Sequence, residues 1–456
     1  MASRVKDLTV GTPWKVITLF SIPIVISYLL QQGYQLADVW MVGNMIPETS
    51  FAAVGTTTPL NLFVTMFAIG TATGFSVVTA QRFGKGDMPS MKKSYIHGLI
   101  LCLIIGIIVT LLACLLTNPL LLAVDINKDN ILYQDSYNYI FIIFIGVIPA
   151  IFYNYFSSIL RAVGNTKMPL VFLIIAALSN ILMNYLFIKL TPLGVSGAAI
   201  ATVLSQLISA ICSFIYIQLR YPEFKFKFKE LVLEKEDVKI HLRQGLPMGI
   251  QFSFLYIALI ILQREVNKFD TGAISAYSAA NKVDALFMQP LNAIGTAMVT
   301  FVGQNYGAKK YSRIKQGIKQ MMIIQSVIIV ILTVAVLLIK DHFIYVMIKE
   351  PTKEAVEYAP IFMFFIALSQ FALGTIFLFR NCLQAVGKSL HAMVVSIIQC
   401  VVRGLLAIVL PLGIGIYGCA IATPIAWYVS SIFFTVFVIR EIFIKLPNDT
   451  PEIEVI

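Results

Sequence analysis

Four polar side chains recur at helical spacing inside the otherwise apolar stretch 15–43. Gln31, Tyr34, Gln35 and Asp38 are separated by three, four and seven residues, so they share one face if the stretch is a helix. A polar face on a long apolar helix is unusual, because ionisable and amide groups are costly to bury in a membrane. We therefore expect this face to line an interior cavity.

Asp38 has no basic neighbour in the sequence, since residues 16–81 contain no Lys, Arg or His. Burial disfavours an ionised carboxylate unless a cation neutralises it, and the neutral acid must take up a proton. In both cases the charge of Asp38 could be exchanged against a coupling ion or a substrate, which is the chemistry that an antiporter needs. The alternative is a structural hydrogen bond to a neighbouring helix.

Amide and hydroxyl side chains elsewhere in the first half could complete such a site. In LSNILMNYLF, Asn180 and Asn184 lie one turn apart and therefore on one face of a helix. Asn154 and Thr202 could supply further oxygen or amide groups. Together with Asp38 they predict a polar pocket in the first half, although each could equally hold helices together.

The second half contains a different set of charged residues within an apolar run. Lys282 and Asp284 are two residues apart in AANKVDALF, so they do not share a helix face and each needs a partner on another helix. Arg403 is one possible partner for Asp284, and a structural pair and a transport role are equally open. For Glu265, at the end of a run, extension toward the membrane interface is the simpler explanation.

The elements that must position these residues are long apolar runs. Hydrophobic residues make up 58% of the chain and charged residues 12%, which is typical of an integral membrane protein. Runs near the 20 residues needed to cross a bilayer recur about twelve times, which predicts an all-α fold of twelve transmembrane helices. We place them near residues 15–43, 52–80, 95–117, 133–158, 169–188, 195–219, 245–266, 273–301, 318–339, 358–382, 389–410 and 415–439.

Charge and residue usage exclude several function classes. The net charge of +11 is concentrated in alternate loops, with about 25 of the 34 Lys and Arg on the side that holds both termini. This bias predicts cytoplasmic termini and contact with the lipid bilayer, with no nucleic acid partner. Six cysteines without CxxC spacing and four scattered histidines predict no metal site. No phosphate-binding loop or nucleophile and base pair stands out, so we expect neither a cofactor nor an enzyme.

The sequence contains an internal repeat. Four motifs recur in the same order at an offset of about 220 residues, among them GVSGAAIAT at 194–202 and GIYGCAIAT at 415–423. Because each half has six predicted helices, the halves must be parallel repeats, and we expect a central V-shaped cleft between them. The predicted domains are an N-terminal lobe (1–219), a cytoplasmic linker read as a solvated connector (220–244) and a C-terminal lobe (245–456).

Several stretches taken together resemble the multidrug and toxic compound extrusion (MATE) family of bacterial efflux transporters. They include IPIVISYLLQQGYQLADVWMVGN, AQRFGKGD, LRAVGNTKMP and FVGQNYGAKK, and the likeness runs over both halves. The resemblance implies two six-helix lobes and export of bulky, often cationic and aromatic compounds in exchange for protons or sodium. It also implies that Asp38, Asn180 and Thr202 match the acidic residue, asparagine and threonine of the family's first lobe.

The sequence departs from that family at positions that bear on the coupling ion. Many members carry an aspartate where this chain has Asn184, and some carry an acidic pair in helices 7 and 10 of the second lobe, which is missing here. Asp38 would then be the main acid, and we favour protons over sodium. The expected cation-coupling residues are Asp38, Asn180, Asn184 and Thr202, and the candidates for the substrate cleft are Gln31, Tyr34, Gln35, Asn154, Lys282 and Asp284.

We therefore predict a secondary antiporter of the bacterial inner membrane. It would be monomeric and would export small organic molecules, cationic and aromatic in character, by alternating access. The nearest alternative is a flippase for a lipid-linked saccharide, which would need several basic residues in its cleft. A membrane-embedded enzyme or a passive channel is disfavoured by the duplicated lobes and the scarcity of His and acid clusters.

Overall fold

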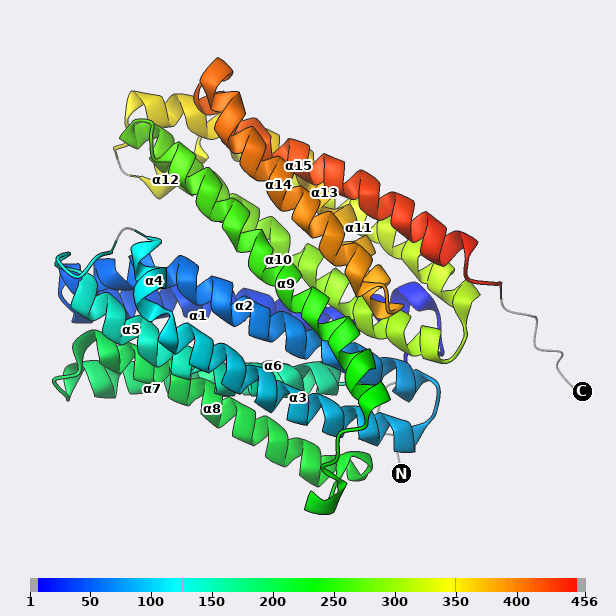
Figure 1. Ribbon diagram of the computed structural model, residues 1–456. Helices are drawn as coiled ribbons and strands as arrows, with labels where there is room; N and C mark the ends of the chain where they lie inside the picture. The colour runs from blue at the N-terminus through cyan, green and yellow to red at the C-terminus, as the bar shows by residue number, and fades with distance from the viewer. Residues whose placement is uncertain (1–6, 125, 349, 449–456) are drawn as a thin grey trace, which may run out of the picture. The chain divides into compact units, whose positions relative to one another are not determined.

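The computed structural model describes residues 7–124, 126–348 and 350–448, which form helices and connecting turns without a strand (Figure 1). The chain divides into two compact units. The first contains Asp7 and Ile26–Ser253, and the second contains Leu8–Val25 and residues 254–448. Two helices, α1 (Pro13–Met45) and α9 (Lys235–Val266), therefore contribute residues to both units.

The first unit is built from helices of the first half of the chain. Apart from its parts of α1 and α9, its elements are α2 (Glu48–Gly84), α3 (Met88–Leu115), α4 (Thr117–Leu122), α5 (Tyr133–Ile145), α6 (Val147–Ala162), α7 (Lys167–Asn184), the π-helix η1 (Tyr185–Lys189), α8 (Gly194–Arg220) and the short 3₁₀ turns η2 (Pro222–Phe224) and η3 (Phe228–Glu230).

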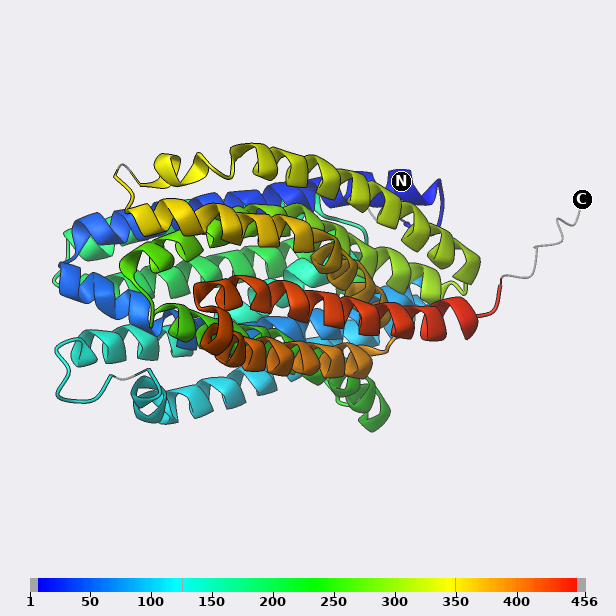
Figure 2. The same ribbon diagram turned by 90° about the horizontal axis from the view of Figure 1, so that it is seen from above.

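The second unit also consists of long helices, with fewer interruptions between them. Its further elements are α10 (Thr271–Gly307), α11 (Tyr311–Ile339), α12 (Phe343–Met347), α13 (Lys353–Ala385), α14 (Ser389–Ile414), α15 (Ile416–Val438) and the π-helix η4 (Ile439–Ile444). In both views α15 lies beside α13 and α14 along much of its length (Figures 1 and 2).

The number of helices confirms the sequence prediction. In the described ranges, eleven helices are long and apolar enough to cross a membrane, or twelve if α5 and α6 form one span. The sequence predicts a single run at 133–158, but α5 and α6 are bent by 42° at Gly146. Pro149, in the first turn of α6, has no N–H to donate to a preceding turn, so the helix cannot continue straight through this point.

Small residues let α2 and α9 approach closely within the first unit. A Cβ atom at Gly74 would lie 2.6 Å from Cα of Gly245, and one at Gly70 would lie 2.6 Å from the carbonyl oxygen of Met248. Both neighbours are backbone atoms, which cannot move aside as a flexible side chain can. Glycine is therefore required here for contact between the two helices, as is common where membrane helices pack tightly.

The segment between α8 and α9 packs onto the first unit and is more than a solvated connector. Phe224 is fully buried, with its ring centroid 4.8 Å from that of Tyr95 on α3. Lys92 of α3 donates a 2.9 Å hydrogen bond to Glu230, and this contact holds the pKa of the Glu230 carboxyl below its usual range. The alternating Phe and Lys pattern of this segment therefore includes an anchoring aromatic residue.

Replacing Gly74 by Ala tests the close contact between α2 and α9. We expect Gly74→Ala to destabilise the protein by about 1–3 kcal/mol, since the added methyl group meets backbone atoms. Thermal unfolding of the purified protein in detergent measures the change. Gly55→Ala in the same helix is the matched control, because a Cβ at Gly55 meets no atom within 4 Å. It should leave the melting temperature equal or slightly higher, and equal destabilisation by both changes would contradict the packing argument.

Candidate ion-coupling site

Asp38 lies on α1, within the first unit, and is half-buried. Its Oδ1 atom accepts a hydrogen bond of 2.5 Å from the Asn184 side-chain amide at the end of α7. Among the described residues, no Lys, Arg or His forms an ion pair with this carboxylate within 4.0 Å. The carboxylate is thus held in place by a neutral donor.

A chain of hydrogen bonds continues from Asn184 into α7 and α8. The amide nitrogen of Asn184 also donates to Oδ1 of Asn180 at 3.2 Å, and the amide nitrogen of Asn180 donates to the Thr202 hydroxyl at 3.3 Å. Thr202 in turn donates to the carbonyl oxygen of Ala198 at 3.0 Å. The Asn184 amide thus donates in both directions, and the chain ends in an acceptor on each side, the Asp38 carboxylate and the carbonyl oxygen of Ala198.

The local backbone places Asn184 where it can reach Asp38. α7 ends at Asn184, and the next residues form the wider π-helical turn η1. Such turns interrupt the regular hydrogen-bond ladder and are frequent at functional sites. Asn180 and Asn184 have exposed fractions of 1% and 0%, and Oδ1 of Asn184 has no hydrogen-bond partner in the described structure. A buried acceptor without a donor is costly, so this oxygen favours a bound proton donor or cation beside it.

The structure thus brings the four predicted coupling residues together in one hydrogen-bonded chain, of which the other first-half candidates are not members. Gln31 and Gln35 are exposed on α1, and Tyr34 is half-buried one turn before Asp38. Asn154 donates to the carbonyl oxygen of Ala150 at 2.9 Å, within its own helix α6. These positions stay predictions for a substrate-binding surface.

Asp284 in the second unit has a partner that the sequence analysis does not single out. Its Oδ1 atom accepts a 3.1 Å hydrogen bond from the amide of Gln370 on α13. Arg403 on α14 is 8% exposed and attracts Asp284 electrostatically, but the two form no ion pair within 4.0 Å in the described structure. Lys282 is exposed.

The remaining residues that the sequence analysis considered are Glu265 and the possible metal ligands. Glu265 is paired with Lys268, one turn further along the chain, with Nζ and Oε2 2.6 Å apart. The six cysteines are all free. Among the described residues, no group of His, Cys, Asp and Glu is arranged to hold a metal ion.

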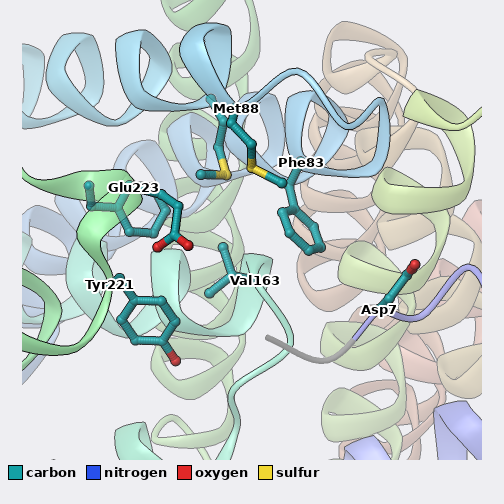
Figure 3. A pocket seen from close by; sticks show the side chains of 8 residues that line it. Asp7, Phe83, Met88, Val163, Tyr221 and Glu223 are labelled. Atoms are coloured by element: carbon teal, nitrogen blue, oxygen red, sulfur yellow. The ribbon is translucent and has the colours of Figure 1, made fainter. Parts of the chain in front are cut away.

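A cavity of about 280 Å³ occurs elsewhere in the first unit, at the end that carries the segment after α8 (Figure 3). Apolar and aromatic side chains form most of its wall. None of the predicted site residues lines it, so it is separate from the Asp38 chain. Its lining residues are Asp7, Phe83, Met88, Met91, Val163, Tyr221, Glu223 and Phe224.

Comparison with known proteins identifies the family. The family model described as MatE matches the chain twice, over residues 23–186 and 247–409. The chain belongs to the MatE family. The two matches also agree with the duplication that the sequence motifs predict. As a MatE protein the chain is a membrane transporter and not an enzyme.

Individual relatives extend over most of the chain. "Probable multidrug resistance protein YpnP" of Bacillus subtilis (strain 168) is 27% identical over 398 residues, which is 87% of this chain and 88% of that protein. A protein of Shewanella oneidensis named "FAD transporter" is 22% identical over 423 residues, 90% of this chain and 91% of that protein. A crystal structure of "MATE in complex with MaL6" matches with a TM-score of 0.87 at 21% sequence identity. The match covers 97% of this chain and 99% of the chain in that structure. This likeness confirms the fold.

Removing the Asn184 amide tests the hydrogen bond to Asp38. We expect Asn184→Ala to lower thermal stability by about 1–3 kcal/mol and to reduce transport, because the Asp38 carboxylate loses its donor and the Asn180 oxygen loses another. Asn44→Ala is the control, since that exposed amide bonds only to the carbonyl oxygen of Trp40 in its own helix, α1. Unfolding in detergent and dye efflux from proteoliposomes give the two readouts. An Asn184→Ala protein that matches wild type in both would show that the contact is unimportant.

Proposed function

We propose that this MatE protein is a secondary antiporter that exports organic cations in exchange for H⁺ or Na⁺. The observation that carries the proposal is the Asp38 carboxylate on a membrane-spanning helix, bound by a neutral amide and by no fixed cation in the described structure. A carboxylate in this position needs a neutralising partner, because an isolated charge is costly within the membrane. A mobile cation fits that need, and its exchange for a cationic substrate gives antiport.

The hydrogen bond between Asn184 and Asp38 supports protons as the coupling ion. An amide N–H can donate to a carboxylate oxygen and equally to the carbonyl oxygen of a protonated carboxyl group. Asp38 could therefore gain or lose a proton at its other oxygen without breaking this contact. Sodium is the alternative, since the unpartnered Asn184 oxygen and the Asp38 carboxylate offer the oxygen ligands that a hard cation prefers.

The proposed substrates are bulky, cationic and aromatic compounds. Asp38 supplies negative charge, and aromatic residues, which form 12% of the chain, can hold flat cations by stacking and cation–π contacts. The relative named as a probable multidrug resistance protein supports this substrate class. Alternating access, a monomeric state and cytoplasmic termini complete the proposal, with the bacterial plasma membrane as the location.

A second candidate is export of an anionic substrate. The relative named "FAD transporter" supports it, as does Arg403, which is 8% exposed and whose buried Nε atom has no hydrogen-bond partner in the described structure. A guanidinium in such a place binds carboxylate or phosphate groups well. Asp284 lies near enough to oppose an anion there, so we rank this candidate second.

Efflux from proteoliposomes under separately imposed pH and sodium gradients tests the proposal. We expect a cationic dye to be exported by the wild-type protein under one of the two gradients and not by Asp38→Asn, which removes the exchangeable charge. Asp284→Asn, placed in the other unit, is the matched control and should retain gradient dependence. Gradient-driven efflux that persists in Asp38→Asn and disappears in Asp284→Asn would move the coupling site to the second unit. Export of FAD in place of the dye would support the second candidate.

A further inference from the structure

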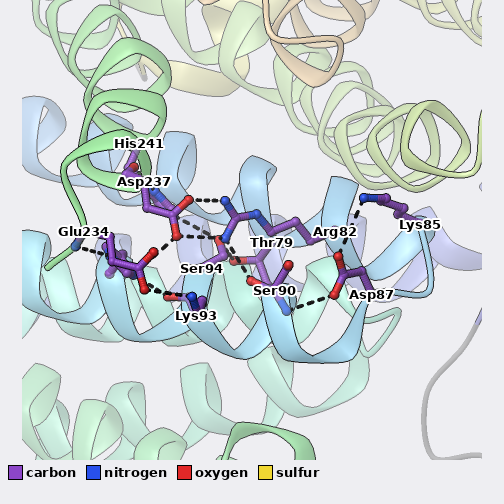
Figure 4. Close-up of polar contacts among 11 residues, drawn as sticks. Thr79, Arg82, Lys85, Asp87, Ser90, Lys93, Ser94, Glu234, Asp237 and His241 are labelled. Atoms are coloured by element: carbon purple, nitrogen blue, oxygen red, sulfur yellow. Dashed lines mark hydrogen bonds and ion pairs between the residues drawn. The ribbon is translucent and has the colours of Figure 1, made fainter. Parts of the chain in front are cut away.

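A buried polar cluster joins the end of α2, the start of α3 and the start of α9 in the first unit (Figure 4). Arg82 of α2 forms an ion pair with Asp237 of α9 and also donates to the carbonyl oxygen of Ser90 at 2.9 Å. His97 of α3 and His241 of α9 have exposed fractions of 2% and 0%. The coupling chain around Asp38 uses none of these residues.

The hydrogen bonds determine which nitrogen of each imidazole carries the proton. Nδ1 of His97 lies 2.8 Å from the carbonyl oxygen of Lys93, and Nδ1 of His241 lies 2.7 Å from that of Asp237. A carbonyl oxygen only accepts, so each Nδ1 must be the donor. Each Nε2 atom is then free to act as an acceptor.

Both Nε2 atoms form hydrogen bonds, but only the partner of His97 is a group that must donate. His97 Nε2 accepts the backbone N–H of Glu234 at 2.8 Å, immediately before α9 begins. His241 Nε2 lies 2.9 Å from the Ser94 hydroxyl, which lies 2.9 Å from the Thr79 hydroxyl. A hydroxyl can turn and become an acceptor, but a backbone N–H cannot. The described state therefore requires a neutral His97.

Charged side chains of α2, α3, α9 and the segment before α9 surround His97. On α2 and α9 the nearest are Arg82 and Asp237, and Asp237 Oδ2 lies 3.9 Å from His97 Nδ1 but is already paired with Arg82. The His241 ring is stacked on the His97 ring, with 6.0 Å between the two ring centroids. Lys93 lies on α3, the helix of His97, and Glu234 lies in the segment before α9. The two form an ion pair of 2.7 Å with each other. A protonated His97 would thus lose the Glu234 N–H contact at Nε2 while its Nδ1 stays beside the Asp237 carboxylate.

We propose that His97 is a proton-operated latch that holds the start of α9 against α3. The neutral imidazole accepts the Glu234 N–H and keeps the chain docked. The protonated imidazole cannot accept it, so the segment around Glu234 and the first residues of α9, up to Glu236, are released. Histidine is the side chain most used in pH-dependent switches, and the charge bias predicts that this end faces the cytoplasm.

The Arg82–Asp237 ion pair and the His241–Ser94 hydrogen bond hold α9 from Asp237 onward, but the other contacts of the segment before Asp237 do not substitute for the latch. Lys92 with Glu230 and Lys93 with Glu234 are exposed pairs, and such pairs contribute little to stability. Phe224 anchors the chain further upstream, so release is confined to the residues after it. Since α9 continues past Ser253 into the second unit, the latch would link the pH at this end to the helix that leads from one unit to the other.

Hydrogen–deuterium exchange of the full-length protein in lipid nanodiscs tests the latch without substrate or gradient. Between about pH 8 and pH 5.5, we expect the wild-type amides at residues 231–236 to become about two- to tenfold less protected, after correction for the intrinsic pH dependence of exchange. His97→Gln keeps an acceptor oxygen and has no titratable proton, so its protection should match wild type at pH 8 and stay constant on acidification. His391→Gln, in the second unit, is the matched control and should behave as wild type.

Two results would overturn the proposal. One is wild-type protection that does not change with pH, and the other is a His97→Gln protein that keeps the wild-type pH response. His241→Gln separates the two histidines, because the pH response should survive in it. Loss of the response in His241→Gln together with its retention in His97→Gln would assign the proton to His241 and contradict the latch. Since the readout is local protection, it is independent of the role proposed for Asp38.

Discussion

The central constraint in this protein is the cost of a carboxylate within a membrane-spanning helix when no fixed cation lies beside it. Asp38 satisfies only part of its hydrogen-bonding capacity through Asn184, and in the mechanism that we propose a mobile cation neutralises its charge. A buried ion pair would have removed this demand and with it the reason to bind an ion. The neutral amide chain positions the carboxylate without supplying the missing charge.

The rest of the first unit positions that chain. Asn184 lies at the junction of α7 with a π-helical turn, and its neighbours Asn180 and Thr202 continue the network into α8. Glycines at 70 and 74 allow α2 to pack against the backbone of α9, and the segment before α9 is docked through Phe224 and the Glu234 N–H. This unit thus contains one polar network around Asp38 and another at the start of α9.

Sequence reasoning predicts the first of these places and not the second. Asp38, Asn180, Asn184 and Thr202 are recognisable because each interrupts an apolar run, where a polar group needs a reason to be present. The twelve runs and their duplication are equally visible, since both depend on local composition. The bend between α5 and α6 is harder to predict from the sequence, although Gly146 and Pro149 could have indicated it.

Contacts between distant segments cannot be predicted in this way. His97 and His241 are 144 positions apart and look unrelated in the sequence, because their stacking depends on how α3 and α9 pack. The contact between Gln370 and Asp284 is hidden for the same reason.

The most direct measurement of the central claim is equilibrium binding of a fluorescent organic cation to the purified protein across a range of pH and sodium concentrations. If Asp38 is neutralised either by the coupling ion or by the substrate, wild-type affinity for the cation should fall as the concentration of one of the two ions rises. The same titration of Asp38→Asn should give an affinity that does not depend on that ion. Competition that persists unchanged in Asp38→Asn would contradict the account, since the substrate and the ion would then compete at a site that does not include this carboxylate.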